Sequence, residues 1–255
     1  NGDMKHHNYK RFAFTLSEVL ITLGIIGVVA AIFTPGLIQN YEKQETAAKV
    51  KTAYSILSQA INDSISENGD IDSWDFSLLY KDFANKYLVP YLKISEICDS
   101  VACIRSKMED GRYFRGYYEL NGEKNAGIMY SFILNNGMIV MMNQTTLNLV
   151  VITVDINGNS GKNTLGRDIF AFYLLNHSSP TALNWTKKYS AGLYPGGVGE
   201  SGTPHAGKTR DELLSASSHR ACNKETTSGG HGGVGTACAA VIAKDGWRIT
   251  KGYPW

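Results

Sequence analysis

FTLSEVLITLGIIGVVAAIFTPGLI, residues 14–38, is the stretch that decides the architecture of this chain. From Val19 to Phe33 only Thr22 is polar, and residues 14–38 reach the roughly 20 apolar residues that a helix needs to cross a bilayer. Basic residues precede this stretch, which favours a cytoplasmic N-terminus and predicts that everything after it lies on the extracytoplasmic side. A buried core helix, a cleaved secretory signal and a plain single-span anchor are the competing interpretations.

Glu18 is a carboxylate inside this otherwise apolar stretch. A charged side chain within a membrane segment is costly, so it indicates a functional role and a partner of opposite charge. Cleavage after Ala13 would give Phe14 a positively charged α-amino group, about one helical turn before Glu18. That amine could neutralise the acid of a neighbouring copy inside an apolar bundle, whereas a plain anchor leaves Glu18 unexplained.

The run A-FTLSEVLITLGIIGVVAAIFTP resembles the prepilin cleavage and methylation segment of type IV pilins and type II secretion pseudopilins. In that family a short basic leader ends in Gly, sometimes Ala. Phe-Thr-Leu follows, then a Glu at the fifth mature position and a long apolar helix. The residues that match this pattern position by position are Ala13, Phe14, Thr15, Leu16 and Glu18.

The resemblance implies cleavage between Ala13 and Phe14 by a dedicated prepilin peptidase, followed by N-methylation of Phe14. Pro35 also falls where the helix of the family commonly carries a proline. Two residues depart from the family pattern. Ala13 replaces the usual Gly, which predicts slower cleavage, and Ser17 replaces a more usual Ile, which predicts no consequence.

After Pro35 the pattern changes from uniformly apolar to amphipathic. Asn68-Gly69 is the predicted end of this helix, which from Phe14 onward would be about 80 Å long at 1.5 Å per residue. Pro35 is expected to kink or weaken the helix, because proline removes a backbone donor. The apolar positions that repeat at helical spacing are Val50, Tyr54, Leu57, Ile61 and Ile65.

The rest of the chain predicts strands joined by tight turns. A second helix is expected over residues 73–88 and a short one over residues 237–243, and Asn135-Asn136-Gly137 is a strong hairpin signal. Strands that follow one another through tight turns argue for an antiparallel meander, with one face available to pack on the amphipathic helix. This is an α+β arrangement, and it agrees with the pilin-like fold that the resemblance implies. The expected strands cover residues 112–120, 128–134, 138–142, 147–155 and 169–175.

These patterns divide the chain into four expected segments. The first is a prepilin leader, and the second is a transmembrane helix through which subunits polymerise. An amphipathic helix follows, and the last segment is an extracytoplasmic pilin-like α+β domain with a glycine-rich, disulfide-bonded C-terminal region. The expected bounds are residues 1–13, 14–38, 39–69 and 70–255.

Charge and cysteine content limit the possible partners. With 25 basic and 23 acidic residues the formal net charge is +2, so no nucleic-acid partner is expected. The four cysteines fall as two close pairs, Cys98 with Cys103 and Cys222 with Cys238. Three connectivities are possible. Local pairing is the simplest and fits an oxidising compartment, and four free, buried thiols are the alternative.

The loop V-D-I-N-G-N-S-G-K-N-T-L-G-R-D-I-F, which begins at Val154, is the best candidate for chemistry. Its carboxylate and amide oxygens are ligands that calcium favours. An EF-hand is excluded, because Ser160 stands where that loop needs Gly and Gly166 where it needs Glu. The alternative is a plain Asn-Gly turn with Asx hydrogen bonds. The candidate calcium ligands are Asp155, Asn157, Asn159 and Asp168.

Residues 202–209, GTPHAGKT, fit the phosphate-loop pattern G-x-x-x-x-G-K-[ST]. That pattern binds phosphate only where it follows a buried strand and opens a helix. The residues before it, YPGGVGESG, indicate a flexible loop instead. No Ser, His and Asp set stands out by a local signature either, so the sequence predicts a protein that is not an enzyme.

The sequence therefore predicts a structural subunit of a type IV pilus or a type II secretion pseudopilus. The extracytoplasmic part is large for a bulk subunit, which favours a minor subunit. The expected partners are other pilin or pseudopilin subunits, a prepilin peptidase and methyltransferase, the inner-membrane assembly platform and membrane lipid. The chain would begin in the bacterial inner membrane and end in a periplasmic or cell-surface filament. The alternative is a single-span anchored domain that binds an extracytoplasmic ligand or mediates adhesion.

Overall fold

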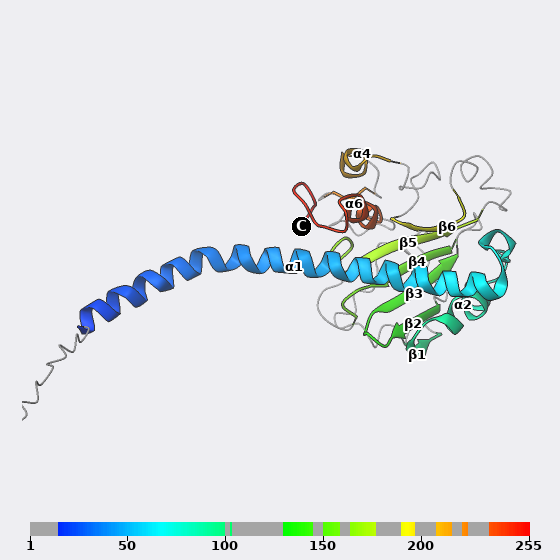
Figure 1. Ribbon diagram of the computed structural model, residues 1–255, viewed down its shortest axis with the longest axis horizontal. Helices are drawn as coiled ribbons and strands as arrows, with labels where there is room; N and C mark the ends of the chain where they lie inside the picture. Colours follow the sequence, from blue (N-terminus) through cyan, green and yellow to red (C-terminus); the bar gives the residue numbers. More distant parts are fainter. Residues whose placement is uncertain are drawn as a thin grey trace, which may run out of the picture. The chain divides into compact units, whose positions relative to one another are not determined.

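The computed structural model describes residues 15–99, 103, 130–144, 150–158, 164–176, 190–196, 208–215, 221–223 and 235–255 (Figure 1). The chain divides into two compact units, residues 1–42 and residues 43–255. Among the described residues, one helix is long and apolar enough to cross a membrane, and it lies near the N-terminus.

That helix, α1, runs from Leu16 to Asn68. It ends where the sequence predicts. Gly69 follows it with a φ of 78°, a left-handed conformation that glycine adopts readily, and the Gly69 N–H donates to the carbonyl O of Ile65 at 3.0 Å. Pro35 lies inside α1, so the expected weak point does not end the helix.

The second half of α1 buries one stripe of its surface. Val50, Leu57 and Ile61, three of the apolar positions predicted from helical spacing, are buried, while Tyr54 and Ile65 are partly buried against the same core. The amphipathic pattern is therefore confirmed. The buried residues of α1 are Ala47, Val50, Ala53, Leu57, Ala60, Ile61 and Ser64.

Three short helices replace the single helix expected over residues 73–88. They are η1 (Ile71–Ser73), α2 (Tyr80–Tyr87) and η2 (Val89–Tyr91). The prediction is wrong in its first half because the Asp75 carboxylate accepts the N–H of Ser77 at 2.9 Å, and such a local turn competes with helix formation. The ring of Trp74 stacks on Tyr87 with centroids 4.6 Å apart, which packs the non-helical part against α2.

A six-stranded antiparallel sheet follows, and its spatial order is the chain order. This confirms the predicted meander. Asn135-Asn136-Gly137 forms the predicted hairpin turn. Gly137 has a φ of 85°, and its N–H donates to the carbonyl O of Leu134 at 2.8 Å. The strand expected over residues 112–120 lies outside the described residues. The strands are β1 (Ile94–Cys98), β2 (Tyr130–Leu134), β3 (Ile139–Gln144), β4 (Val150–Asp155), β5 (Ile169–Leu175) and β6 (Gly192–Pro195).

Strands β4 and β5, which both lie inside the sheet, are buried at every residue, so both faces of the sheet are covered there. One face shares a hydrophobic core with the second half of α1, and the ring of Phe172 lies 6.2 Å from that of Tyr54. Residues of the opposite face, among them Met141 and Tyr173, belong to two smaller clusters. Figure 1 shows the second half of α1 lying across the strands of the sheet.

The C-terminal part of the chain adds two short helices, α4 (Arg210–Ser215) and α6 (Cys238–Lys244). The second lies within one residue of the expected helix over residues 237–243. Its residues enter the same core as α1. The aromatic side chains that follow also pack there, and the ring of Trp247 lies 5.1 Å from that of Tyr54.

Candidate functional site

The N-terminal end of α1 is closed by reciprocal hydrogen bonds between Thr15 and Glu18. The N–H and hydroxyl of Thr15 donate to Glu18 Oε2 at 2.8 and 2.9 Å, and the Glu18 N–H donates to Thr15 Oγ1 at 3.2 Å. This is a capping box, in which two side chains satisfy backbone donors that a helix start leaves free. The sequence analysis missed this role, although the spacing T-x-x-E is its usual signature.

Glu18 therefore has a partner within its own chain, and its negative charge lies at the helix end where the backbone dipole favours it. Ala13 and Phe14, between which cleavage is predicted, lie outside the described residues.

The apolar side chains that follow Glu18 are exposed along the first half of α1. Phe33 is 64% exposed and Leu37 is 69% exposed. Gly24 and Gly27 lie in this half, and a methyl group added to either would meet no atom within 4 Å. Packing within the described residues 15–42 therefore does not explain why small residues stand at these positions.

The turn that leaves β4 is built around Asp155. Its Oδ1 accepts the N–H groups of Asn157 and Gly158 at 3.1 and 3.0 Å, which is the Asx turn expected as the alternative to a calcium site. Gly158 has a φ of 60°, and a Cβ at this position would overlap the carbonyl O of Gly137. Glycine is required there both for the backbone conformation and for the close approach of the β2–β3 turn.

A second turn, residues 164–168, carries Asp168 back to the same end of the sheet. The Asp168 carbonyl O accepts the N–H of Ile156 at 2.8 Å, and its carboxylate Oδ2 accepts the N–H of Thr164 at 3.3 Å. The structure thus joins two of the predicted calcium ligands, Asp155 and Asp168, through adjacent turns. Asn159 lies outside the described residues.

Both carboxyl groups have shifted pKa values. Burial raises the pKa of Asp155 to about 7; the hydrogen bonds from Asn157 and Gly158 oppose this shift, and the nearby charge of Asp168 adds to it. Burial likewise raises the pKa of Asp168 to about 6, against the hydrogen bond from Thr164 and nearby positive charges. Burial therefore makes loss of the proton unfavourable at both carboxyl groups.

Two buried oxygen atoms beside these turns lack a hydrogen-bond donor in the described part of the chain. They are Oδ2 of Asp155 and Oδ1 of Asn157. A buried polar atom without a partner is unusual and calls for an explanation, such as a bound ion or water. Carboxylate and amide oxygens fit the donor set of calcium.

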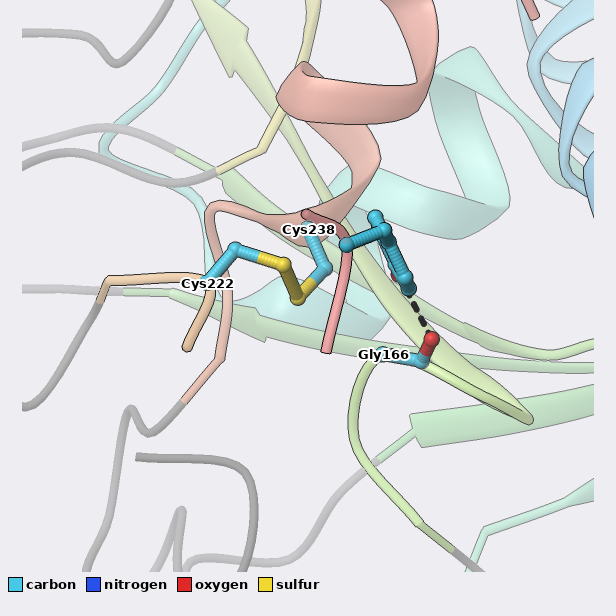
Figure 2. Close-up of a disulfide and its surroundings, with 4 residues drawn as sticks. Gly166, Cys222 and Cys238 are labelled. Atoms are coloured by element: carbon cyan, nitrogen blue, oxygen red, sulfur yellow. Dashed lines mark hydrogen bonds between the residues drawn. A yellow bond between two sulfur atoms is a disulfide. The ribbon is translucent and has the colours of Figure 1, made fainter. Parts of the chain in front are cut away.

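Both predicted disulfide pairs are present in the structure. Cys98 is bonded to Cys103, and Cys222 to Cys238. The Cys222–Cys238 bond lies beside Gly166 (Figure 2). A Cβ at Gly166 would be 2.8 Å from Cys238 Sγ, so the disulfide packs directly on the turn of residues 164–168.

Two residues of the phosphate-loop pattern, Lys208 and Thr209, belong to the described part of the chain, and Thr209 directly precedes α4. Residues 201–207 lie outside it. The N–H and hydroxyl of Thr209 donate to the Glu212 carboxylate at 2.6 and 2.7 Å. The hydroxyl that would hold a metal–nucleotide complex therefore acts as a helix cap.

A groove of about 550 Å³ lies between the second half of α1, the segment before β1 and the β2–β3 turn. Its lining is mostly apolar, with Asp63 and Lys93 as the charged residues and no histidine or cysteine.

We predict that acidification stabilises the domain through Asp155. Because folding raises the pKa of this acid, the folded state binds the proton more tightly, and the stabilisation is lost as pH rises from about 4 through about 7. Asp155→Asn keeps the Oδ1 acceptor and removes the ionisation. The free energy of unfolding of this variant, measured in detergent with a chelator present, should fall less than that of the wild type between pH 4 and pH 8, by on the order of a few kcal/mol.

Asp70→Asn is the matched control, because Asp70 is exposed and its side chain caps no helix. Its pH profile should follow that of the wild type. Parallel profiles for wild type and Asp155→Asn would show that Asp155 does not carry the pH dependence.

Two family models match the chain. The model described as "Family of unknown function (DUF6613)" matches residues 36–255, and the model of the "Prokaryotic N-terminal methylation motif" matches residues 8–34. No curated protein and no solved structure matches. The chain carries the methylation motif on an apolar helix, and an antiparallel sheet follows this helix in the sequence. These features are those of a type IV pilin-like or pseudopilin-class protein. The match over residues 36–255 shows that the chain belongs to the family of unknown function DUF6613.

Proposed function

We propose that this protein is a minor structural subunit of a type IV pilus or a type II secretion pseudopilus. One observation carries the proposal: the methylation motif covers a helix whose apolar side chains are exposed along residues 16–38. A continuous apolar surface of this kind needs lipid or other protein chains to cover it. Membrane lipid would cover it before assembly, and the same half of neighbouring subunits would cover it in the filament.

The proposed maturation begins with a prepilin peptidase at the inner membrane. Residues 1–13 would be removed as the leader, residues 14–38 would span the bilayer, and residues 39–69 would connect this span to the extracytoplasmic domain of residues 70–255. Gly24 and Gly27 support close helix packing between subunits, because small residues let helices approach each other. The size of residues 70–255 is the reason for proposing a minor subunit at or near the filament tip.

We predict that the mature protein begins at Phe14 and carries one additional methyl group. Ala13→Gly should increase the processed fraction, since Gly is the usual residue before the cleavage site in the family that the motif resembles. Intact-mass spectrometry of the protein extracted from membranes measures both quantities. Retention of the leader in the exported protein would contradict the proposal.

Glu18 and Thr15 allow the charge and the helix cap to be tested separately. Glu18→Gln removes the negative charge but keeps a side chain that can complete the capping box. Thr15→Val removes the hydroxyl cap and keeps the charge. If the acid pairs with the new amine of a neighbouring subunit, Glu18→Gln should lower the amount of subunit in sheared surface filaments by about tenfold, the equivalent of 1.4 kcal/mol, while Thr15→Val should have little effect.

Immunoblots of sheared and membrane fractions measure this result, with equal membrane levels of both variants as the control. Normal assembly of Glu18→Gln would favour the alternative function, a single-span anchored domain that binds a ligand or mediates adhesion. Loss of assembly in Thr15→Val alone would assign the role of Glu18 to the cap.

We also propose that the turns of Asp155 and Asp168 hold a calcium ion. The support is the pair of buried oxygens on Asp155 and Asn157 that have no donor among the described residues. Calcium at about 100 times its dissociation constant should stabilise the folded protein by about 2.7 kcal/mol. Calorimetric titration and thermal unfolding should show binding for wild type and Asp70→Asn but not for Asp155→Asn. If calcium gives neither a heat of binding nor a shift in the unfolding temperature of the wild type, the plain Asx turn is the correct interpretation.

A further inference from the structure

The C-terminal part of the chain holds the turn of residues 164–168 at several points. The Tyr253 hydroxyl donates to the Gly166 carbonyl O at 2.6 Å, and this contact is buried. The sulfur of Cys238 also lies close to the same residue, since a Cβ on Gly166 would be 2.8 Å from it (Figure 2). The next residue, Arg167, has its guanidinium 4.5 Å from the centre of the Trp255 ring. Two consecutive residues of the turn are therefore contacted by residues that are distant in sequence.

The turn of residues 164–168 also supports the turn that carries Asp155. The Asp168 carbonyl O is the acceptor for the Ile156 N–H at 2.8 Å, and Gly166 N–H donates to the carbonyl O of Ile169 at 3.0 Å. Displacement of residues 164–168 would remove the acceptor of Ile156. The position of the two carboxyl-bearing turns thus depends on the contacts made by the C-terminal part of the chain.

The C-terminal segment, residues 245–255, is itself fastened to α4. Arg210 donates to Asp245 Oδ1 at 2.7 Å, to Thr250 Oγ1 at 2.9 Å and to the carbonyl O of Lys251 at 2.8 Å. Arg210 thus connects the start and the middle of this segment to α4.

The Cys222–Cys238 disulfide supplies the covalent part of this arrangement. The N–H of Cys222 donates to the carbonyl O of Leu213 in α4 at 2.9 Å, and Cys238 is the first residue of α6. The bond therefore links the residue that docks on α4 to the helix that leads into the C-terminal segment.

We propose that Cys222–Cys238 is a redox-dependent lock on the turn of residues 164–168. Closure of the lock forms one S–S bond: the two thiols give up two protons and two electrons to a disulfide-bonded oxidant, which leaves as a dithiol. With the bond closed, Cys238 and Tyr253 hold Gly166 and the adjacent Asp168. Reduction restores the two thiols and releases the turn, while the sheet stays folded.

Because of the lock, the position of the two turns would depend on the redox state of the compartment. This point rests on the proposed extracytoplasmic location. Disulfides persist in oxidising compartments and are rare in the cytosol. The two turns would therefore become fixed only after the domain has crossed the membrane.

Hydrogen–deuterium exchange of the full-length protein in detergent tests the lock. The amides to follow are those of Ile156, Gly166 and residues 168–169, whose hydrogen bonds lie within or between the two turns. In Cys222→Ser/Cys238→Ser these amides should exchange at least about tenfold faster than in the oxidised wild type. Reduction of the wild type with a dithiol should reproduce the change, and reoxidation should reverse it. Tyr253→Phe, with the disulfide intact, should accelerate exchange at Gly166 by a smaller factor.

Cys98→Ser/Cys103→Ser is the control, because the other disulfide joins the end of β1 to Cys103 and packs with Leu165 and Ile169, whereas the atoms nearest Gly166 are those of Cys238 and Tyr253. In this variant the amides of Ile156 and Gly166 should exchange at the wild-type rate. Unchanged exchange of the turn in Cys222→Ser/Cys238→Ser would overturn the proposal. Equal acceleration in β3 and β4 would also overturn it, since the bond would then stabilise the whole domain instead of one turn. Failure of filament assembly leaves this measurement unaffected, so the two proposals fail separately.

Discussion

The burial of one stripe of α1 against the sheet is the interaction on which the rest of the structure depends. Val50 and Leu57 share a core with Phe132 and Phe172 of the facing strands, and full burial of such a side chain contributes about 1.5–3 kcal/mol. The same helix exposes its apolar residues before Ile38. One continuous helix therefore has its second half stabilised by its own sheet and its first half suited to lipid or to other copies. In the proposed function, this division would let the chain move from membrane to filament without refolding.

The acid at the start of α1 has one role in the structure and a second that is proposed. As part of the capping box with Thr15, Glu18 satisfies backbone donors and benefits from the helix dipole. As a negative charge in an apolar segment, it would also be available to the cation that the proposed cleavage before Phe14 supplies. The first role helps a single chain to begin its helix. The second, proposed role acts only between chains.

At the far end of β4, the structure places polar groups where water is excluded. Asp155 and Asp168 are brought together by adjacent turns, and burial raises the pKa of both carboxyl groups. Such an arrangement is costly for folding unless another part of the chain or a ligand compensates for it. The contacts of Tyr253 and Cys238 with Gly166 hold one of these turns in place, and calcium is the proposed ligand. The described residues at the C-terminal end of the chain therefore gain a role that their composition does not indicate.

Local patterns determined much of this protein from the sequence alone. Apolar periodicity and Asn68-Gly69 predicted α1 and its end, alternating strands and Asn135-Asn136-Gly137 predicted the meander, and the methylation motif identified Glu18. The tertiary structure decided the rest. β1 was missed because its exposed pattern and irregular register hide it, and β6 because Gly and Pro are poor strand formers. The hydrogen bond from Tyr253 to Gly166 joins residues that are 87 positions apart in the sequence. No local pattern encodes such a contact, because it exists only once the sheet and α1 have brought distant segments to the same surface.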